Sequence, residues 1–246
     1  MKAIILAAGY ATRMYPLTLN RPKALLTLNG RAIIDYIVEQ INGLSAADEI
    51  IVVTNHKFYE NFRVWTKDVR SKIPISLLND GSTDENNRLG AIGDIIFTLN
   101  EKKIDDDLLI IAGDNYSTYP LIEQYGLFTE KQSDIICAKK LADRNLLKRF
   151  AVAELDSSGR VVNLVEKPDN PQSDYGVFAT YFYKKETLPL FAEYKKSGQN
   201  TDAPGYFIEW LHKKKDIYAY IMNGDCYDIG TIEAYDEMKK LLGDTD

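Results

Sequence analysis

Three fixed cations follow the first apolar segment of the chain at close spacing. Residues 3–8 carry no charge, Gly9 ends the segment, and Arg13, Arg21 and Lys23 come soon afterwards. A short apolar run of this kind predicts a buried strand in a mostly parallel sheet. Because the backbone N–H groups of a small-residue loop and nearby cations both attract anions, the loop after this strand is predicted to hold phosphates. The alternative is a strand followed by an ordinary polar turn.

Two well-known phosphate-binding loops do not fit these residues. The dinucleotide fingerprint Gly-x-Gly-x-x-Gly would need glycines where the chain has Ala11 and Met14. The Walker-type loop Gly-x-x-x-x-Gly-Lys-Ser/Thr occurs nowhere in the sequence. The predicted loop therefore belongs to a different class.

The opening segment resembles that of the sugar-1-phosphate nucleotidyltransferases. The shared pattern comprises Leu6-Ala-Ala-Gly9, Thr12-Arg13, Pro16-Leu-Thr18 and Pro22-Lys23. The resemblance implies that five loop residues bind a nucleotide, namely Leu6, Ala7, Ala8, Gly9 and Thr12. It also implies two catalytic cations: Arg13 neutralises charge on a departing pyrophosphate, and Lys23 orients phosphates. Ala11 stands where the family usually has a second glycine, so a positive φ at this position would strain the loop.

Two aspartates lie in settings that suit a magnesium ion. Asp114 follows the apolar run 108–112 in a Gly-Asp-Asn sequence, and Asp228 lies in an Asp-Ile-Gly-Thr sequence. Mg²⁺ is commonly bound by one or two carboxylates together with substrate phosphate and water. The family has metal-binding aspartates in both contexts, so the resemblance implies Mg²⁺ at Asp114 and Asp228. The structural alternatives are a turn cap and a helix cap, and Cys226 replaces the Trp that is usual in the family.

The segment Val165-Glu166-Lys167-Pro168 resembles the acceptor-binding part of the same family. The resemblance implies that Glu166 binds sugar hydroxyls and Lys167 the acceptor phosphate; the alternative is an exposed ion pair at a strand end. Neighbouring side chains of an extended segment point to opposite faces. Either Pro168 and the loop after it end the strand and twist the pair towards the crevice, or one ligand bridges the strand end, with its sugar on Glu166 and its phosphate on Lys167. Because the residue before a proline favours extended backbone, Lys167 is predicted to be extended.

Together these motifs predict a Mg²⁺-dependent enzyme that joins a nucleoside triphosphate and a sugar 1-phosphate into a nucleotide-sugar and releases pyrophosphate. The acceptor phosphate would attack the α-phosphorus in line, so catalysis needs positioning and charge neutralisation more than proton transfer. The two histidines, His56 and His212, lack the partner pattern of a general base, and His212 is predicted on a solvated helix face.

The identity of the base is predicted from the polar loop after residue 78. Asn79 and Gly90 are expected to frame the base, and a pyrimidine (dTTP or UTP) is favoured, although thymidylyl- and uridylyltransferases of the family usually present Gln at the position of Asn79. A CTP-dependent cytidylyltransferase acting on a phosphorylated alcohol is the alternative, because Leu78-Asn79-Asp80 resembles such enzymes. A metal-dependent glycosyltransferase would not explain Arg13 and Lys23, and a non-catalytic regulatory relative would have lost one of the cations or aspartates.

The segments that must position these residues alternate between strand and helix. Up to residue 114, the predicted strands are 3–8, 49–54, 74–78 and 107–112, and the predicted helices are 31–44, 57–72 and 90–101. This alternation predicts right-handed parallel crossovers, with ligands at the carboxyl ends of the strands, where Gly9, Asn55, Asn79 and Asp114 should converge. Further strands are predicted at 134–140, 150–156, 161–165, 175–183 and 217–222, and further helices at 121–132, 187–196, 205–214 and 231–242.

The predicted fold class is α/β: a Rossmann-like open mixed, mostly parallel sheet with helices on both faces, as in the nucleotidyltransferase and glycosyltransferase-A-like folds. We expect a single domain over residues 1–246, with a nucleotide-binding half at 1–115 and an acceptor-binding half at 116–246. The acidic triplet 105–107 is predicted as a solvated turn, and 224–230 as a loop.

Composition excludes several other classes of protein. A net charge of -6 over 246 residues gives no basic surface for nucleic acid. No apolar run approaches the roughly 18 residues of a membrane span, so no membrane partner is expected. Two cysteines without metal-ligand spacing suit reduced thiols in a cytoplasmic protein. No pattern in the sequence predicts an oligomeric state.

Overall fold

The computed structural model describes residues 1–243, which form two compact units. The first unit comprises residues 1–88, Ile111–Tyr119 and the segment from Gly224 onwards, and the second comprises Leu89–Ile110 and Pro120–Asn223. The chain leaves the first unit after Arg88 and returns to it twice. The units are therefore built from interleaved segments, and they differ from two consecutive halves at 1–115 and 116–246.

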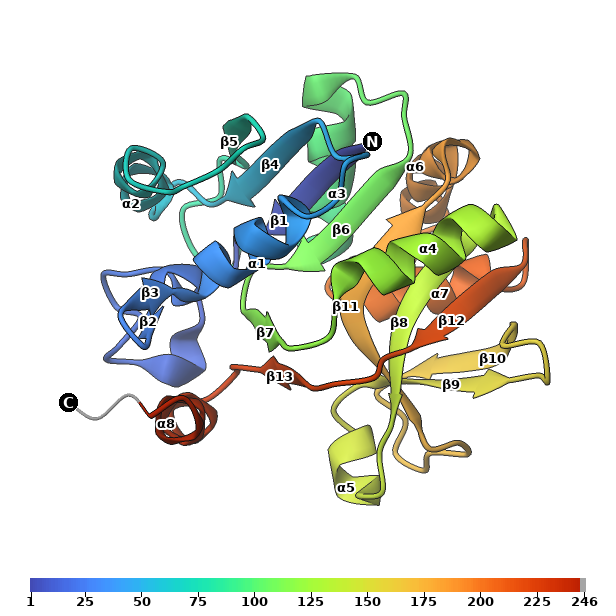
Figure 1. Cartoon of the computed structure of the whole chain (residues 1–246). Helices are drawn as coiled ribbons and strands as arrows, with labels where there is room; N and C mark the ends of the chain where they lie inside the picture. The colour runs from blue at the N-terminus through green and yellow to red at the C-terminus, as the bar shows by residue number, and fades with distance from the viewer. Residues whose placement is uncertain (244–246) are drawn as a thin grey trace. The chain divides into compact units, whose positions relative to one another are not determined.

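The first unit contains a parallel sheet whose strands end at one edge (Figure 1). Strand β1 (Lys2–Leu6) pairs in parallel with β4 (Glu49–Thr54), which pairs in parallel with β5 (Ile75–Asn79). Strand β6 (Leu108–Ala112) ends at the same edge, because the Gly113 N–H donates to the Leu6 carbonyl at 2.8 Å. The buried parallel strand predicted for the first apolar segment is confirmed.

The other elements of the first unit are short. They are the 3₁₀ turns η1 (Thr12–Met14) and η2 (Lys23–Leu25), the strands β2 (Thr27–Leu28), β3 (Arg31–Ala32), β7 (Asn115–Ser117) and β13 (Cys226–Asp228), and the helices α1 (Ile33–Ile41), α2 (Tyr59–Trp65) and α8 (Ile232–Leu241). The predicted helices 31–44 and 57–72 are both too long. The β2–β3 hairpin takes the first residues of one, and turns follow Trp65 in the other.

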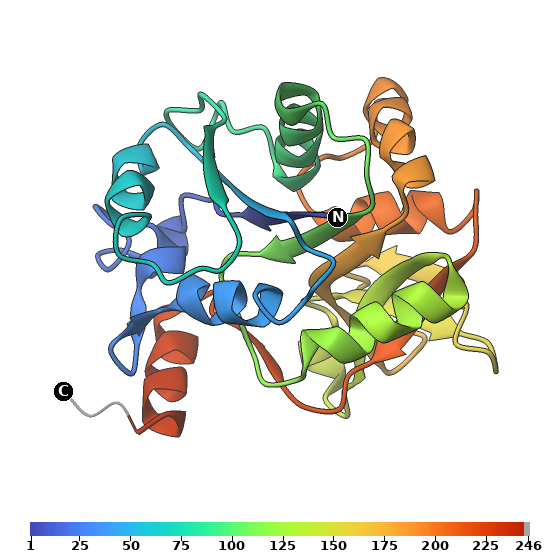
Figure 2. The same ribbon diagram turned by 45° about the horizontal axis from the view of Figure 1, so that its top comes forward.

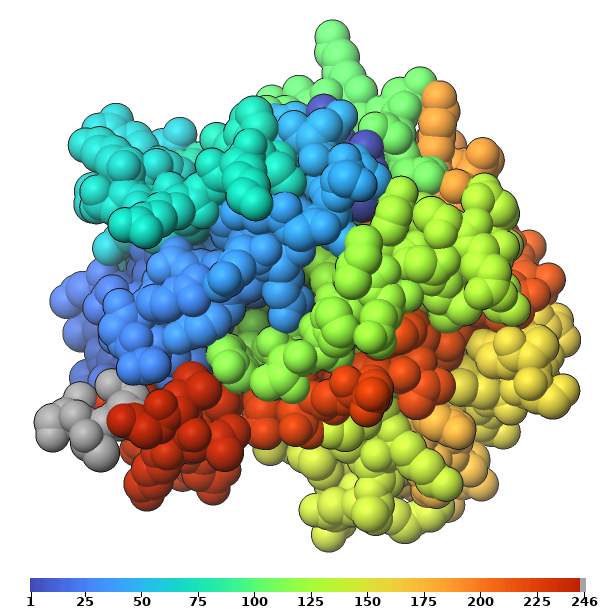
Figure 3. Space-filling model, in the orientation of Figure 1, coloured from blue at the N-terminus to red at the C-terminus, as the bar shows by residue number. Residues whose placement is uncertain are grey.

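Helix α8 packs against the N-terminal part of its own unit, which is coloured blue (Figures 2 and 3). Its residues Tyr235 and Met238 share an apolar cluster with Leu28, and the Tyr235 hydroxyl donates to the Thr27 carbonyl at 2.6 Å. Thr231 caps the helix, because its Oγ1 accepts from the Ala234 N–H at 3.2 Å. The helix predicted at 231–242 is confirmed, and it anchors the segment that carries Asp228.

The second unit contains a mixed sheet arranged around the long strand β11 (Tyr175–Tyr183). Strand β11 is antiparallel to β8 (Asp134–Lys140) and to β9 (Ala151–Leu155), β9 is antiparallel to β10 (Val161–Glu166), and β12 (Ile217–Ile221) is parallel to β8. The remaining elements are α3 (Ala91–Lys102), α4 (Leu121–Lys131), α5 (Arg144–Leu147), η3 (Lys185–Thr187), α6 (Leu188–Lys196) and α7 (Pro204–Leu211).

Helices cover both faces of β11, because successive side chains of a strand point to opposite faces. Phe182 packs on Phe128 of α4, with ring centroids 5.4 Å apart. The next residue, Tyr183, packs on Phe191 of α6 at 5.3 Å and on Phe207 of α7 at 5.8 Å. The predicted fold class, a mixed sheet with helices on both faces, is confirmed. Within residues 1–243, no helix has the length and apolar character that a membrane crossing requires.

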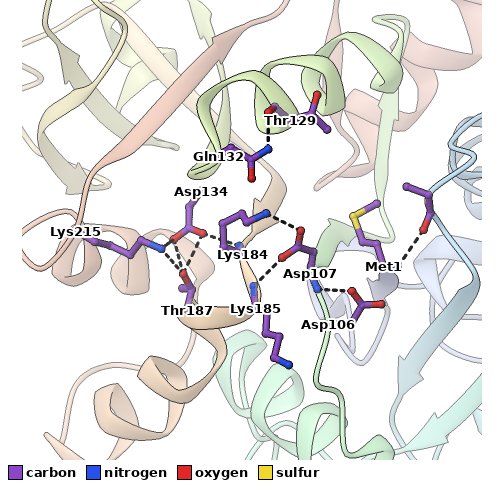
Figure 4. Close-up of polar contacts among 11 residues, drawn as sticks. Met1, Asp106, Asp107, Thr129, Gln132, Asp134, Lys184, Lys185, Thr187 and Lys215 are labelled. Carbon is purple, nitrogen blue, oxygen red and sulfur yellow. Dashed lines mark hydrogen bonds and ion pairs between the residues drawn. The ribbon is translucent and has the colours of Figure 1, made fainter.

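A buried carboxylate in the second unit is compensated by several donors (Figure 4). Asp134 is fully buried and accepts hydrogen bonds from the Thr187 hydroxyl at 2.7 Å and the Lys184 N–H at 2.7 Å. The Lys215 ammonium lies 3.0 Å from the same carboxylate. Burial raises the pKa of the Asp134 carboxyl, while Lys215 and the hydrogen-bond donors act in the opposite direction.

Asp107 lies beside this cluster and is more than part of a solvated turn. Its carboxylate accepts from the Lys185 N–H at 2.8 Å and forms an ion pair with the Lys184 ammonium at 2.8 Å. For Asp107 the prediction of a solvated turn is wrong, because this carboxylate ties the start of β6 to the segment after β11.

We expect Lys215→Met to destabilise the protein by about 3 kcal/mol, because it leaves the buried Asp134 carboxylate without its cation. Met retains most of the apolar stem of the lysine. The matched control is Lys185→Met, whose partner Asp105 is 78% exposed and whose loss should cost less than about 1 kcal/mol. Urea denaturation measures both free energies of unfolding. Equal losses would show that Lys215 contributes no more than a surface ion pair.

Candidate functional site

The loop after β1 is held by polar side chains at the end of β4. The Thr54 hydroxyl donates to the Ala7 carbonyl at 3.1 Å, and the Asn55 amide donates to the Ala8 carbonyl at 2.9 Å. Asn55 is fully buried, and its Oδ1 accepts from the Phe58 N–H at 2.9 Å. Asn55 therefore lies at the strand ends as predicted, and its side chain joins the loop after β1 to the segment that follows β4.

Ala11 adopts the left-handed conformation, with φ 49° and ψ 42°. Its carbonyl accepts from the Met14 N–H at 2.9 Å and from the buried Thr18 hydroxyl at 2.8 Å. These two bonds fix the conformation that a second glycine would adopt more easily. The strain expected for an alanine at this position is therefore present.

Thr12 and Arg13 lie in η1, next to Ala11, and both are exposed. Within residues 1–243 the Arg13 guanidinium makes no hydrogen bond or ion pair with another side chain. Gly9 is also exposed, and a Cβ added to it would meet no atom within 4 Å. The loop thus presents an unpaired cation and an accessible backbone on one stretch of chain.

Lys23 and Asp114 form an ion pair in the first unit. Their side chains are 16% and 27% exposed, so the pair is largely shielded from water. The sequence prediction assigned Lys23 to phosphates and Asp114 to a metal ion. The structure brings the two residues together and leaves both roles untested.

Asp228 reaches the same region through a short antiparallel ladder that the sequence did not predict (Figure 1). Strand β13 pairs with β7 so that Asp228 lies opposite Asn115, the residue after Asp114. The Ile229 N–H also points to the Asp114 carbonyl, at 3.4 Å. The prediction of a loop over 224–230 is wrong for residues 226–228, and the ladder places the two aspartates on adjoining backbone segments.

The donor set at these residues fits a magnesium ion. Two carboxylates on adjoining segments supply hard oxygen ligands, and Mg²⁺ ordinarily takes its remaining ligands from phosphate and water. Within the described part of the chain, no group of three or more His, Cys, Asp or Glu side chains could hold a metal ion by itself. An ion at Asp114 and Asp228 would therefore depend on ligands from a bound molecule.

The two residues predicted to frame the base lie in different units. Asn79 ends β5, where its Oδ1 accepts from the Gly81 N–H at 2.9 Å and its Nδ2 lies 3.1 Å from Nδ1 of His56. Gly90 begins α3 in the second unit with φ 75°, and a Cβ there would lie 2.6 Å from the Thr201 carbonyl oxygen. The close approach of the Thr201 backbone is therefore enough to explain why residue 90 is a glycine.

Glu166 and Lys167 come together because the chain turns sharply after β10. Lys167 has φ 47°, so the prediction that it is extended is wrong. Its N–H donates to the Phe150 carbonyl at 3.1 Å, which holds the turn. As a result the Lys167 ammonium lies 3.8 Å from Oε1 of Glu166, and the strand ends at Glu166, as the first of the two alternatives expected.

The Glu166 carboxylate is only 6% exposed, whereas the Lys167 side chain is 53% exposed. Burial raises the pKa of the Glu166 carboxyl, the Lys167 ammonium lowers it, and the carboxylates of Glu209 and Asp202 raise it. Glu166 is thus a buried carboxylate with one nearby cation and two nearby like charges.

His212 differs from its prediction. It ends α7 half-buried, and its Nε2 is buried without a hydrogen-bond partner among the residues that the structure describes. Burial lowers the pKa of the imidazole, and Lys213 lowers it further. The expectation of a solvated helix face is therefore wrong for this side chain.

Sequence reasoning missed the residues that hold the site rather than form it. Thr18 belongs to the Pro-Leu-Thr motif, and its bond to Ala11 gives a physical reason for the threonine. Gln40 of α1 donates to the Ser117 carbonyl at 2.9 Å and so secures β7. Glu209 accepts from the Glu166 N–H at 3.1 Å. Its position four residues after Gly205, on the same helix face, was the feature of the sequence that could have indicated this contact.

The sequence matches the model of a family described as nucleotidyl transferase over residues 2–245. It is 28% identical to the bifunctional protein GlmU of Methanocaldococcus jannaschii, over 94% of this chain and 51% of that protein. The chain therefore spans about half the length of that relative.

Two further proteins match the chain over almost their whole length. The UTP–glucose-1-phosphate uridylyltransferase AglF of Haloferax volcanii is 24% identical, over 98% of this chain and 96% of its own. A solved structure of UDP-glucose pyrophosphorylase complexed with UDP-glucose superposes with a TM-score of 0.80, at 22% identity and 98% coverage of both chains. The structural likeness supports the fold.

We expect Ala11→Gly to stabilise the protein by about 0.5–1 kcal/mol, because relief of the left-handed strain outweighs the extra freedom of glycine in the unfolded chain. The matched control is Ala192→Gly in α6, an exposed helix position, which should destabilise by up to about 1 kcal/mol. Thermal or urea denaturation of both variants checks the opposite signs. Destabilisation by Ala11→Gly would mean that the loop carries no such strain.

Proposed function

Because the chain belongs to the nucleotidyl transferase family, we propose that it joins a nucleoside triphosphate to a sugar 1-phosphate and forms a nucleotide-sugar and pyrophosphate. The observation that carries the proposal is the meeting of three segments at the sheet edge of the first unit. The loop after β1, the Lys23–Asp114 ion pair and the β7–β13 ladder with Asp228 all lie there. This combination suits a triphosphate and an accompanying cation.

In the proposed reaction an oxygen of the acceptor phosphate attacks the α-phosphorus, and the bond from that phosphorus to the bridging oxygen breaks. Pyrophosphate leaves with the bonding electrons, so negative charge grows on it. Arg13 is exposed on the loop and makes no ion pair with the described residues, so it is available to neutralise that charge. Lys23 orients the phosphates, and Gly9 with the small residues before it lets the backbone approach them.

Asp114 and Asp228 would hold Mg²⁺, which when bound would neutralise phosphate charge. Their carboxylates contribute hard oxygen ligands, and Lys23 balances the charge of Asp114. Lys23, which Asp114 holds beside it, would contact phosphate next to the ion.

The proposed acceptor contacts lie in the second unit. Glu166 would accept hydrogen bonds from sugar hydroxyls, and the more exposed Lys167 would contact the acceptor phosphate. Their separation of 3.8 Å lets one small molecule meet both groups. A pyrimidine triphosphate, dTTP or UTP, is the favoured donor, and Asn79 and Gly90 are the residues assigned to the base.

The experiment that tests the function is a pyrophosphate-release assay over a matrix of donors and acceptors. We expect UTP or dTTP with glucose 1-phosphate to turn over fastest among five nucleoside triphosphates, each paired with glucose 1-phosphate, mannose 1-phosphate and choline phosphate. Turnover only with CTP and choline phosphate would establish the cytidylyltransferase alternative. No pyrophosphate from any pair would contradict the proposal.

The same assay assigns Arg13. Arg13→Ala should lower kcat by about 10²-fold or more, because a charge partner of the transition state is lost. Arg63→Ala is the matched control: this exposed arginine lies on α2, and among residues 1–243 its one ion pair is with the exposed Glu60, so turnover should stay unchanged. Near-normal turnover of Arg13→Ala would remove Arg13 from the catalytic residues.

Removal of the metal gives an independent prediction. Excess chelator should abolish activity, and added Mg²⁺ should restore it. Asp114→Asn and Asp228→Asn should each raise the Mg²⁺ concentration needed for half-maximal activity, and the double variant should lose less than the sum of the two effects, as expected for groups that act as a unit. Full activity in chelator would exclude a metal requirement.

A further inference from the structure

Helix α7 makes room for the Glu166 carboxylate at its first turn. A Cβ added to Gly205 would lie 1.7 Å from Oε2 of Glu166 and 2.9 Å from Cβ of Ala151. Any side chain at position 205 would therefore push the carboxylate out of its place between α7 and β9. Gly205 is a glycine because of this close approach.

The same helix also holds the backbone of Glu166. One turn after Gly205, and on the same face, Oε2 of Glu209 accepts from the Glu166 N–H at 3.1 Å. Helix α7 thus fixes Glu166 at two points. Gly205 sets where the carboxylate lies, and Glu209 sets where the backbone of β10 ends.

The second carboxylate oxygen of Glu166 faces the Lys167 ammonium. Oε2 lies against Gly205, whereas Oε1 lies 3.8 Å from Nζ of Lys167, whose side chain is 53% exposed. The pair therefore offers one carboxylate oxygen and one ammonium group side by side. A ligand that carries a hydroxyl near a phosphate could donate to the first and accept from the second.

We infer that Gly205 and Glu209 are positioning residues that fix the Glu166–Lys167 pair, and that they thereby set discrimination between sugar phosphates that differ at one hydroxyl. The inference rests on the proposed function, in which that pair binds the acceptor. Neither residue needs to touch the acceptor, because each acts through Glu166.

The charges around Glu166 make the pKa of its carboxyl a measure of its position, and a purely structural role of Gly205 and Glu209 would leave this pKa unchanged. The charged groups that shift the pKa of the Glu166 carboxyl are Lys167 beside it, Glu209 on α7 and Asp202 just before α7. The Glu166 charge in turn raises the pKa of the hydroxyls of Tyr181 on β11 and Tyr194 on α6. Glu209 raises the pKa of the Glu166 carboxyl, as does burial. Loss of the Glu209 charge, or exposure of the Glu166 carboxylate, should therefore lower that pKa.

The first arm of the test needs no substrate. Protein labelled with ¹³C at glutamate carboxyl groups is titrated by NMR, and Glu166→Gln identifies the Glu166 signal. Gly205→Ala should lower the pKa of Glu166, because the displaced carboxylate becomes more exposed. Glu209→Gln should also lower it, while it still offers an oxygen to the Glu166 N–H. The control Gly126→Ala, in α4, places a Cβ within 4 Å of no atom and should change nothing.

The second arm measures kcat/KM for glucose 1-phosphate and galactose 1-phosphate, with UTP or the donor that the wild-type enzyme prefers. Gly205→Ala and Glu209→Leu should lower the ratio of the two values about tenfold, because the hydroxyl contact is misplaced. The KM for the triphosphate should change less than about twofold, and Glu209→Gln should retain the ratio. Circular dichroism and thermal midpoints confirm that the variants fold.

The two arms separate failure of the inference from failure of the proposed function. An unchanged Glu166 titration in Gly205→Ala overturns the inference, and so does unchanged discrimination in that variant. If the wild-type protein releases no pyrophosphate with any donor and acceptor, the proposed function fails. The titration then decides alone whether α7 positions Glu166.

Discussion

The first unit depends on how the chain is held where it leaves β1. A loop at the end of a buried parallel strand has backbone groups that the strand ladder no longer satisfies, and burial without partners would be costly. Here Thr54 and Asn55, the residues that end and follow β4, donate to the carbonyls of Ala7 and Ala8. Because Asn55 is fully buried and bonded at both ends of its amide, it leaves the loop little freedom. These hydrogen bonds therefore also help to fix the positions of the cations that follow in the sequence.

Each unit keeps a cation and a carboxylate next to one another in a partly buried setting. Lys23 pairs with Asp114 in the first unit, and Lys167 pairs with Glu166 in the second. A protein with a net charge of -6 has no general excess of cations to attract phosphates. The local pairs instead hold these two lysines in place beside a carboxylate. On the proposed function, phosphate binding at each lysine is then coupled to what its partner carboxylate binds, a cation in one unit and hydroxyl groups in the other.

Features with a long-range pattern could be predicted from the sequence, and features set by a few residues could not. The apolar runs of β1, β4, β8 and β11 and the periodic helices extend over enough residues to indicate their own structure. Strands β7 and β13 have three residues each, too few for any alternation, so the ladder that brings Asp228 beside Asp114 was missed. The turn at Lys167 was missed for another reason: a hydrogen bond to Phe150 overrides the local preference of a residue before proline. The contacts of Gly205 and Glu209 with Glu166 likewise join residues distant in the sequence.

Five residues other than glycine have a positive φ, within the range 1–243, and two of them stand apart. Lys103 and Gln132 end helices α3 and α4, where the left-handed conformation is an ordinary cap, and Asn29 lies in the turn of the β2–β3 hairpin, where asparagine is well suited. Neither reason applies to Ala11 and Lys167. The Ala11 carbonyl accepts from the Met14 N–H and the Thr18 hydroxyl, and the Lys167 N–H donates to the Phe150 carbonyl. Such strain persists only where the surrounding structure determines the conformation, and it is concentrated at functional sites. The two strained residues belong to the two segments assigned to the triphosphate and to the acceptor, and backbone conformation thus supports that assignment independently of side-chain chemistry.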